Sequence, residues 1–255
     1  MDAPIRVTLV ANTGLLLRCG NTGILADALF APGEHGFSAS SPETWEKLLC
    51  GEPPFETVDT LLFTHLHSDH FSPERTLEFL QRRRVKGLLL PYAEDLERQG
   101  FYDAVRESGT TCQLLTERTA KTAFSLAPQV RVEAFRTLHL DPKYHEVPHF
   151  CYRIAFGEKR LLLTADVDYT AETLDFLGED RLRAAFVNPL FFSALRHKRL
   201  FRGTLPTEAV AVYHLPFPEQ DGRQFHRRLA RDLQAWPEDG PRSIVLDREL
   251  QTLEL

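Results

Sequence analysis

The sequence predicts an α/β fold in which two β-sheets pack together with helices outside, as a single domain over residues 1–255. Two observations lead to this prediction. Short apolar runs of strand length alternate with helical patterns in both halves of the chain, and each half begins rich in strands. No repeat, low-complexity tract or Gly/Ser-rich linker interrupts this alternation. With 255 residues and 43% hydrophobic content, the chain can bury a substantial core.

The first elements carry clear boundary signals. The runs "IRVTLV" and "GLLLRC" read as strands, and a Gly-Asn-Thr-Gly turn before "ILADALF" predicts a hairpin. Ser41 as N-cap, Pro42 at the first helical position and Gly51 beyond the end predict a helix over "SPETWEKLLC". The strand "TLLFT" follows, and Ser72 and Pro73 mark the start of the next helix in the same way.

The remaining elements are expected from periodicity alone. Strands are expected over "VKGLLLP", "CQLLT", "KTAFSL", "VRVEAFRTLHL", "HFCYRIAF", "RLLLTA", "RAAFVNP", "EAVAVYHL", "SIVLD" and "LQTLEL". Helices are expected over "AEDLERQG", "FYDAVRESG", "AETLDFLG" and "DGRQFHRRLARDLQAW", the last of which stops at Pro237.

Composition narrows the class of protein. The net charge of -6 argues against nucleic acid as a partner. No apolar run approaches 18 residues, so no membrane span is expected, and the N-terminus lacks the pattern of a signal peptide. The four cysteines form no CxxC pair, which predicts reduced thiols and a cytoplasmic location.

The stretch "THLHSDH", residues 64–70, concentrates metal-binding side chains after an apolar strand and before a helix. His65 and His67 are two apart, so in extended chain they point to the same side and can meet one metal. Asp69 and His70 follow where the chain turns, and can face a second position. Imidazole with carboxylate suits Zn²⁺, and also Fe or Mn. The alternative, a polar loop of solvated histidines, fits this pattern less well.

Three further candidate ligands each close an apolar strand: His139, Asp166 and His214. Such positions lie on rigid supports where a site can form. Competing residues are nearby: His145 and His149 for the histidine, and Asp168 for the carboxylate. Among the other histidines, His35 is expected in a solvated loop, and His197 and His226 on the surface.

This pattern resembles the metallo-β-lactamase fold superfamily of metal-dependent hydrolases. The resemblance rests on "THLHSDH", His139, "TAD" ending at Asp166 and "YH" ending at His214, and it extends over nearly the whole chain, including the early hairpin that leads to Asp27. It implies a four-layer αββα sandwich of two mixed β-sheets with helices outside. The general pattern is closer to the lactonase-like and phosphodiesterase-like branches than to antibiotic-hydrolysing enzymes.

The resemblance also implies a ligand set for two divalent metal ions, zinc first and manganese or iron as alternatives. The first ion would be held by His65, His67 and His139. The second would be held by Asp69, His70 and His214. Asp166 would bridge the two ions. Asp27 would either orient a ligand imidazole or cap a turn.

The expected activity is hydrolysis of a small-molecule ester, lactone or phosphodiester by a metal-bridging hydroxide. Asp69 would orient the hydroxide or accept its proton, and His149 is the candidate proton donor to the leaving group. Further candidates for substrate binding lie in loops after strand ends: His145, Lys143, Tyr144 and Asn188. The alternatives on the same fold are an iron-dependent thiol dioxygenase, an RNA or DNA nuclease, and a non-catalytic metal-binding protein.

Overall fold

The computed structural model describes residues 3–33, 36–116, 118–170, 172–178, 180–193, 200 and 205–255. The chain divides into two compact units. The first comprises the chain up to Thr119 together with Glu249–Leu255, and the second comprises Ala120–Arg248. Each unit is described below by itself, and the single domain expected over residues 1–255 stays a prediction.

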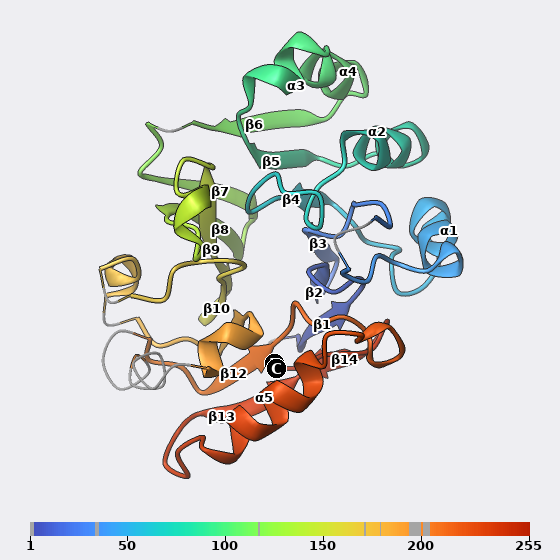
Figure 1. Ribbon diagram of the computed structural model, residues 1–255. Coiled ribbons are helices and arrows are strands. Elements are labelled where there is room, and N and C mark those ends of the chain that lie inside the picture. Colours follow the sequence, from blue (N-terminus) through green and yellow to red (C-terminus); the bar gives the residue numbers. More distant parts are fainter. Residues whose placement is uncertain are drawn as a thin grey trace. The chain divides into compact units, whose positions relative to one another are not determined.

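The first unit is built on a mixed seven-stranded sheet (Figure 1). Its order is β14-β1-β2-β3-β4-β5-β6, with β3 to β6 parallel and the other pairs antiparallel. The strands are β1 (Ile5–Leu9), β2 (Leu15–Cys19), β3 (Thr22–Ala26), β4 (Thr60–Leu62), β5 (Gly87–Pro91), β6 (Thr111–Leu115) and β14 (Thr252–Glu254). The helices are α1 (Pro42–Cys50), α2 (Pro73–Arg82), α3 (Glu94–Arg98) and α4 (Phe101–Glu107).

The helix boundaries in this unit follow the capping signals. The Ser41 Oγ accepts a hydrogen bond from the Thr44 N–H at 3.2 Å, and Ser72 Oγ does the same for the Arg75 N–H at 3.2 Å. Gly51 closes α1 with a φ of 71°, a conformation that favours glycine. Both predicted helices are therefore confirmed.

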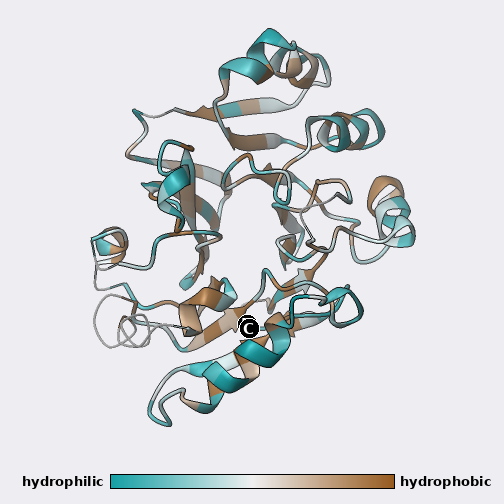
Figure 2. Ribbon diagram, viewed as in Figure 1, coloured by the Kyte–Doolittle hydropathy of each residue, from teal (hydrophilic) through white to brown (hydrophobic). Residues whose placement is uncertain are grey.

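The helices of the first unit bury their apolar faces against the sheet. Leu48 of α1 and Phe79 of α2 share a hydrophobic core with Leu25, Leu61 and Leu88 of the strands. In Figure 2 the strands are mostly brown and the helices carry teal faces, as this one-sided burial requires.

The second unit has its own mixed seven-stranded sheet, in the order β13-β12-β11-β10-β9-β8-β7. Strands β10 to β13 run parallel and β7 to β10 antiparallel. The strands are β7 (Lys121–Ala127), β8 (Val130–Thr137), β9 (His149–Phe156), β10 (Lys159–Leu163), β11 (Ala184–Val187), β12 (Ala209–Val212) and β13 (Arg242–Val245).

Helix α5 (Phe225–Gln234) covers one face of this second sheet, and Figure 1 shows it running beside β12 and β13. Its Leu229 is buried in a core with Leu162 and Val210. Short 3₁₀ turns occupy the connections: η1 (Pro142–Tyr144), η2 (Asp175–Leu177), η3 (Pro189–Phe192) and η5 (Pro218–Gln220).

One predicted helix is wrong. Of the segment "AETLDFLG", only η2 is helical, and Ala171 lies outside the described residues. Thr170 Oγ1 accepts a hydrogen bond from the Thr173 N–H at 3.1 Å, as Ser41 and Ser72 do at the starts of their helices. The turn that follows continues only as η2, in which the Leu177 N–H donates to the Leu174 carbonyl at 3.1 Å. Leu174 and Leu177 are both buried at a spacing of three, which suits a 3₁₀ turn.

The fold class is confirmed. Two mixed β-sheets of seven strands, with helices in both units, are the parts that the αββα architecture requires. Within the described residues, no helix has the length and hydropathy needed to cross a membrane.

Candidate metal centre

The motif segment lies between β4 and α2, where a tight turn holds its side chains together. The N–H groups of His70 and Phe71 both donate to the His67 carbonyl, at 2.9 and 3.0 Å. The Ser72 N–H donates to the Leu29 carbonyl at 2.8 Å, which ties the end of the turn to the segment after β3. His65 and His70 are fully buried.

Asp27 is hydrogen-bonded to His70 directly and to His65 through the Thr64 hydroxyl. Its Oδ1 accepts from the Thr64 N–H at 2.8 Å, and its Oδ2 accepts from Thr64 Oγ1 at 2.6 Å and from His70 Nδ1 at 3.0 Å. Because a carboxylate only accepts, the proton of His70 lies on Nδ1. The Thr64 hydroxyl gives its only hydrogen to Asp27, so it accepts from His65 Nδ1 at 3.1 Å.

The consequence is that both His65 and His70 carry their protons on Nδ1 and present Nε2 as a lone pair. This is the protonation that a histidine needs to bind a metal through Nε2. Of the two roles that the sequence left open for Asp27, its hydrogen bonds fit the orientation of the candidate imidazoles.

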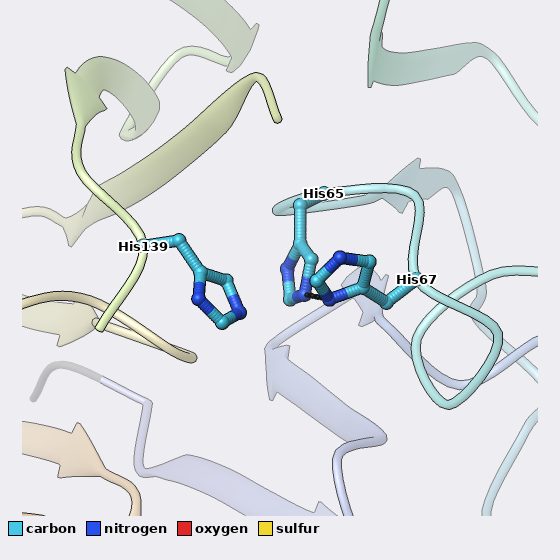
Figure 3. A group of neighbouring side chains, drawn as sticks. All are labelled: His65, His67 and His139. Carbon is cyan, nitrogen blue, oxygen red and sulfur yellow. Dashed lines mark hydrogen bonds between the residues drawn. The ribbon is translucent and has the colours of Figure 1, made fainter. Parts of the chain in front are cut away.

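The nitrogens of His65 and His67 point toward one another (Figure 3), with Nε2 of His65 3.0 Å from Nδ1 of His67. Two nitrogens bound to one tetrahedral zinc ion at ordinary bond lengths lie about 3.3 Å apart. The pair therefore has close to the spacing of two ligands on one ion. Nε2 of His70 lies 3.9 Å from Oδ2 of Asp69, a looser pair of the same kind.

The turn between β1 and β2 is hydrogen-bonded to the motif segment. Thr13 Oγ1 donates to the Asp69 carbonyl at 2.6 Å and lies 3.1 Å from the Asp27 carbonyl. Gly14 permits this close approach, because a Cβ there would meet Ala28 Cα at 2.8 Å.

In the second unit, Asp166 lies between two histidines and turns one oxygen toward each. Its Oδ2 is 3.7 Å from Nε2 of His139, and its Oδ1 is 3.4 Å from Nε2 of His214. All three residues are buried. They lie two or three residues beyond the ends of β8, β10 and β12, so all three strands end earlier than predicted and the three residues follow the strands instead of closing them.

His139 is held by its own backbone surroundings. It forms an isolated β-bridge with Val167, and its Nδ1 accepts from the Asp141 N–H at 3.0 Å. In this arrangement a neutral ring carries its proton on Nε2. Ligation through Nε2 requires that proton to move to Nδ1, which breaks the hydrogen bond to Asp141.

Three residues at or next to candidate site positions have a left-handed backbone conformation. Asp27, Ala165 and His214 have positive φ values of 47°, 46° and 62°, among five such non-glycine residues in the described chain. A left-handed conformation is costly for most side chains, and such strain concentrates at functional sites. Two of the three residues are themselves site candidates, and Ala165 precedes Asp166.

The other candidates near His139 have structural partners. His149 is fully buried; its Nδ1 lies 2.7 Å from Thr137 Oγ1, and its ring centroid is 6.0 Å from that of His139. Lys143 pairs with Asp141 at 3.1 Å, and the Tyr144 ring lies 5.1 Å from the His139 ring. His145 is half-buried beyond η1.

The remaining candidates fall elsewhere. Asp168 donates its N–H to the Leu138 carbonyl at 2.8 Å, which fixes the backbone of the chain beside Asp166. His226 is half-buried in α5 and pairs with Asp221 at 2.8 Å, so it is less exposed than expected. His35 and His197 lie outside the described residues.

The donor set fits divalent transition metals. In the first unit, buried imidazole nitrogens converge with a carboxylate, and in the second a carboxylate is flanked by two imidazoles. Nitrogen with carboxylate oxygen is the ligand chemistry of zinc and, with other geometries, of iron and manganese. Sequence reasoning missed the hydroxyl of Thr64, because a threonine before a histidine carries no signal until its partner Asp27 is placed.

Comparison with known proteins agrees with this description. No curated protein matches the chain. Among solved structures, the metallo-hydrolase Igni18 from Ignicoccus hospitalis is similar, with 18% identity, a TM-score of 0.62 and coverage of 99% of this chain and 98% of that one. A structure from Veillonella parvula described as a possible metal-dependent hydrolase has 13% identity, a TM-score of 0.62 and full coverage of both chains.

A third similar structure is CmlA, a diiron beta-hydroxylase from Streptomyces venezuelae, with 17% identity and a TM-score of 0.56. The match covers all of this chain and 55% of CmlA, so the chain spans about half the length of that protein. At these identities the similarities show the fold. The family model of the beta-lactamase superfamily domain matches residues 22–210, which is most of the chain, and the protein therefore belongs to this family.

Proposed function

We propose that the protein is a dinuclear metal-dependent hydrolase that acts on a small-molecule ester, lactone or phosphodiester. The family and the His/Asp clusters support a metal-dependent hydrolase. The number of metal ions, their identity and the substrate are the parts that we propose.

The proposed ligands form two groups with a shared carboxylate. His65, His67 and His139 would hold the first ion. Asp69, His70 and His214 would hold the second. Asp166 would bridge the two.

The observation that carries the two-metal proposal is the position of the Asp166 carboxylate in the second unit. Its oxygens face two different histidines, at 3.7 Å and 3.4 Å. A nitrogen and a carboxylate oxygen on one zinc ion lie about 3.4 Å apart at ordinary bond lengths. A carboxylate that bound a single ion would be expected to have candidate ligands near only one of its oxygens, whereas both oxygens of Asp166 face a histidine.

Two bound ions would supply hydroxide at neutral pH and polarise the group under attack. The chain's own residues have separate tasks. Asp27 and Thr64 fix the protonation of His65 and His70, as their hydrogen bonds require. Asp69, anchored through its carbonyl by Thr13, would orient the nucleophile or accept its proton. We keep His149 as the candidate proton donor, next to His139.

Zinc is the metal that we propose first, with manganese and iron as alternatives. CmlA is a diiron protein with a similar fold, so iron belongs in any test of metal preference. All four cysteines are free thiols, and on this basis we also propose a cytoplasmic location.

The test is metal analysis of the reconstituted full-length protein, followed by a screen of chromogenic phosphodiesters, lactones, esters and thioesters. Separate samples would receive Zn²⁺, Mn²⁺ or, without oxygen, Fe²⁺. About two equivalents of one metal, with hydrolysis of at least one substrate class, is the expected result. Less than about half an equivalent after reconstitution would refute the metal proposal. The Asp166→Asn variant is the comparison sample that should lose metal and hydrolysis, because it keeps the side-chain size and removes the charge.

A further inference from the structure

Asn188 lies in the second unit where β11 ends, and its side chain is fully buried. Its Nδ2 donates to the Ala165 carbonyl at 3.0 Å and to Oδ1 of Asp166 at 3.3 Å. Its Oδ1 accepts from the Leu190 N–H at 3.0 Å. A backbone N–H can only donate, so the amide cannot be turned over, and Nδ2 must be the group that faces Asp166.

A chain of hydroxyl groups holds the backbone of Asn188. Its N–H donates to the Tyr169 hydroxyl at 3.0 Å, which lies 2.8 Å from Thr164 Oγ1. Thr164 Oγ1 donates its only hydrogen to the Phe186 carbonyl at 2.9 Å, so the Tyr169 hydroxyl donates to Thr164. Burial raises the pKa of the Tyr169 phenol far above its usual range, so the phenol keeps this proton.

The contact with Asn188 falls on one particular oxygen of Asp166. Oδ1 accepts from Asn188 and is also the oxygen that lies 3.4 Å from His214 Nε2, while Oδ2 faces His139. A carboxylate can otherwise rotate about its last torsion, which has a broad and nearly two-fold energy profile. The hydrogen bond from Asn188 restrains this rotation and favours the orientation in which one oxygen faces each histidine.

We propose that Asn188 is a positioning residue that holds the Asp166 carboxylate in its two-sided orientation, and that Tyr169 and Thr164 hold Asn188 in turn. This inference rests on the proposed function, because it assigns the carboxylate to two ions. It replaces the substrate-binding role that the sequence suggested for Asn188, since both polar atoms of its amide already have protein partners.

The test uses Asn188→Ala and Tyr169→Phe in the full-length protein, with Asn21→Ala in the exposed turn after β2 as a matched control. Metal-free protein would be titrated with Co²⁺ and Zn²⁺ against a chromophoric chelator, and the Co²⁺ absorption spectrum recorded at each step. Loss of a residue that orients a ligand typically weakens metal binding about 10–100-fold. We expect this loss for the second equivalent in Asn188→Ala, and a smaller loss in Tyr169→Phe.

The outcomes separate the inference from the proposed function. Two equivalents in the wild type, with a weakened second equivalent and an altered Co²⁺ spectrum in Asn188→Ala, support it. Two equivalents with unchanged affinity and spectrum in both variants overturn the inference and leave the proposed function intact, even where thermal stability falls. Less than half an equivalent in the wild type overturns both. If Asn188→Ala does not fold, Tyr169→Phe decides, because it retains the amide and loosens only its support.

Discussion

Asp27 is the residue whose substitution tests the site most sharply, because one carboxylate sets the protonation of two histidines. Its oxygens accept from the Thr64 N–H, the Thr64 hydroxyl and His70 Nδ1. In Asp27→Asn, the amide oxygen can keep the bond to the Thr64 N–H. The amide nitrogen then faces a hydroxyl and an imidazole that both donate to the native carboxylate.

The substitution should therefore reverse two tautomers. The amide of the variant would donate to His70 Nδ1, and the proton of that ring would move to Nε2. It would also donate to the Thr64 hydroxyl, which would turn and donate to His65 Nδ1. His65 would then carry its proton on Nε2 as well. Both imidazoles would lose the lone pair that a metal needs.

The magnitude follows from the number of bonds affected. Loss of the group that orients a ligand histidine weakens metal binding by about 10–100-fold, or about 1.4–2.7 kcal/mol. We expect this loss at both proposed ions, since His65 belongs to the first and His70 to the second. Two hydrogen bonds to a charged acceptor become bonds between neutral groups, which lowers folding stability by about 2–3 kcal/mol.

The assay is a competition titration with Zn²⁺ at a temperature where circular dichroism shows the variant to be folded. Asp59→Asn is the matched control: Asp59 also binds a backbone N–H, of Gly23 at 3.1 Å, and an ion-pair partner, but no candidate ligand. Thr64→Val provides the second arm. It removes the acceptor of His65 Nδ1 and leaves the contact between Asp27 and His70 in place.

We expect Thr64→Val to weaken the first equivalent alone and Asp27→Asn to weaken both. Wild-type affinity at both equivalents in folded Asp27→Asn would refute the tautomer argument. If Thr64→Val weakened metal binding equally at both equivalents, the protonation of His65 and of His70 would not depend on separate hydrogen bonds. That result would also contradict the tautomer argument.

Three further predictions concern single residues. His139→Ala should remove the first metal and nearly all activity, whereas His149→Ala should keep its metal content; the reverse result in metal analysis would exchange their roles. Asp166→Asn should fold but lose most of the second metal and of hydrolysis, and a structure of the metal-loaded wild type with this carboxylate well outside about 2.5 Å of either ion would contradict the bridging role. Ser41→Ala should lower the free energy of unfolding by about 1 kcal/mol in urea titration, with no change in metal content, because only the cap of α1 is lost.

Much of the fold could be predicted from the sequence, because the capping residues and the apolar patterns of most segments indicate the elements that the structure contains. The two serine caps and the proline at each helix start predicted where α1 and α2 begin, and Gly51 predicted where α1 ends. The segment "AETLDFLG" shows the limit. Its periodicity is compatible with an α-helix, but the buried Leu174 and Leu177, three residues apart, suit a 3₁₀ turn equally well, and a pattern of apolar spacing does not distinguish the two.

The candidate ligands and their supports differ in what the sequence can say about them. His65, Asp166 and His214 are uncommon residue types at the ends of apolar runs, so type and position together predict a role. Asn188 and Tyr169 also follow strands, but amides and phenols serve as caps and buried hydrogen-bond partners throughout proteins. Their role depends on which atom faces which partner, and that is decided by the register of β10 and β11 and by the left-handed turn at Ala165.

The same reasoning explains why the support network is a better test of the proposed function than the ligands are. Removing a ligand abolishes metal binding in almost any arrangement of the site, so the result distinguishes few models. Removing Thr64 or Asn188 leaves every proposed ligand in place and alters only the proton or the orientation of one of them. A selective loss at one equivalent then requires that the named ligand, the named ion and the named hydrogen bond all be correct. Thr64 lies in the first unit and Asn188 in the second, so the two variants test proposed ligands of each unit separately.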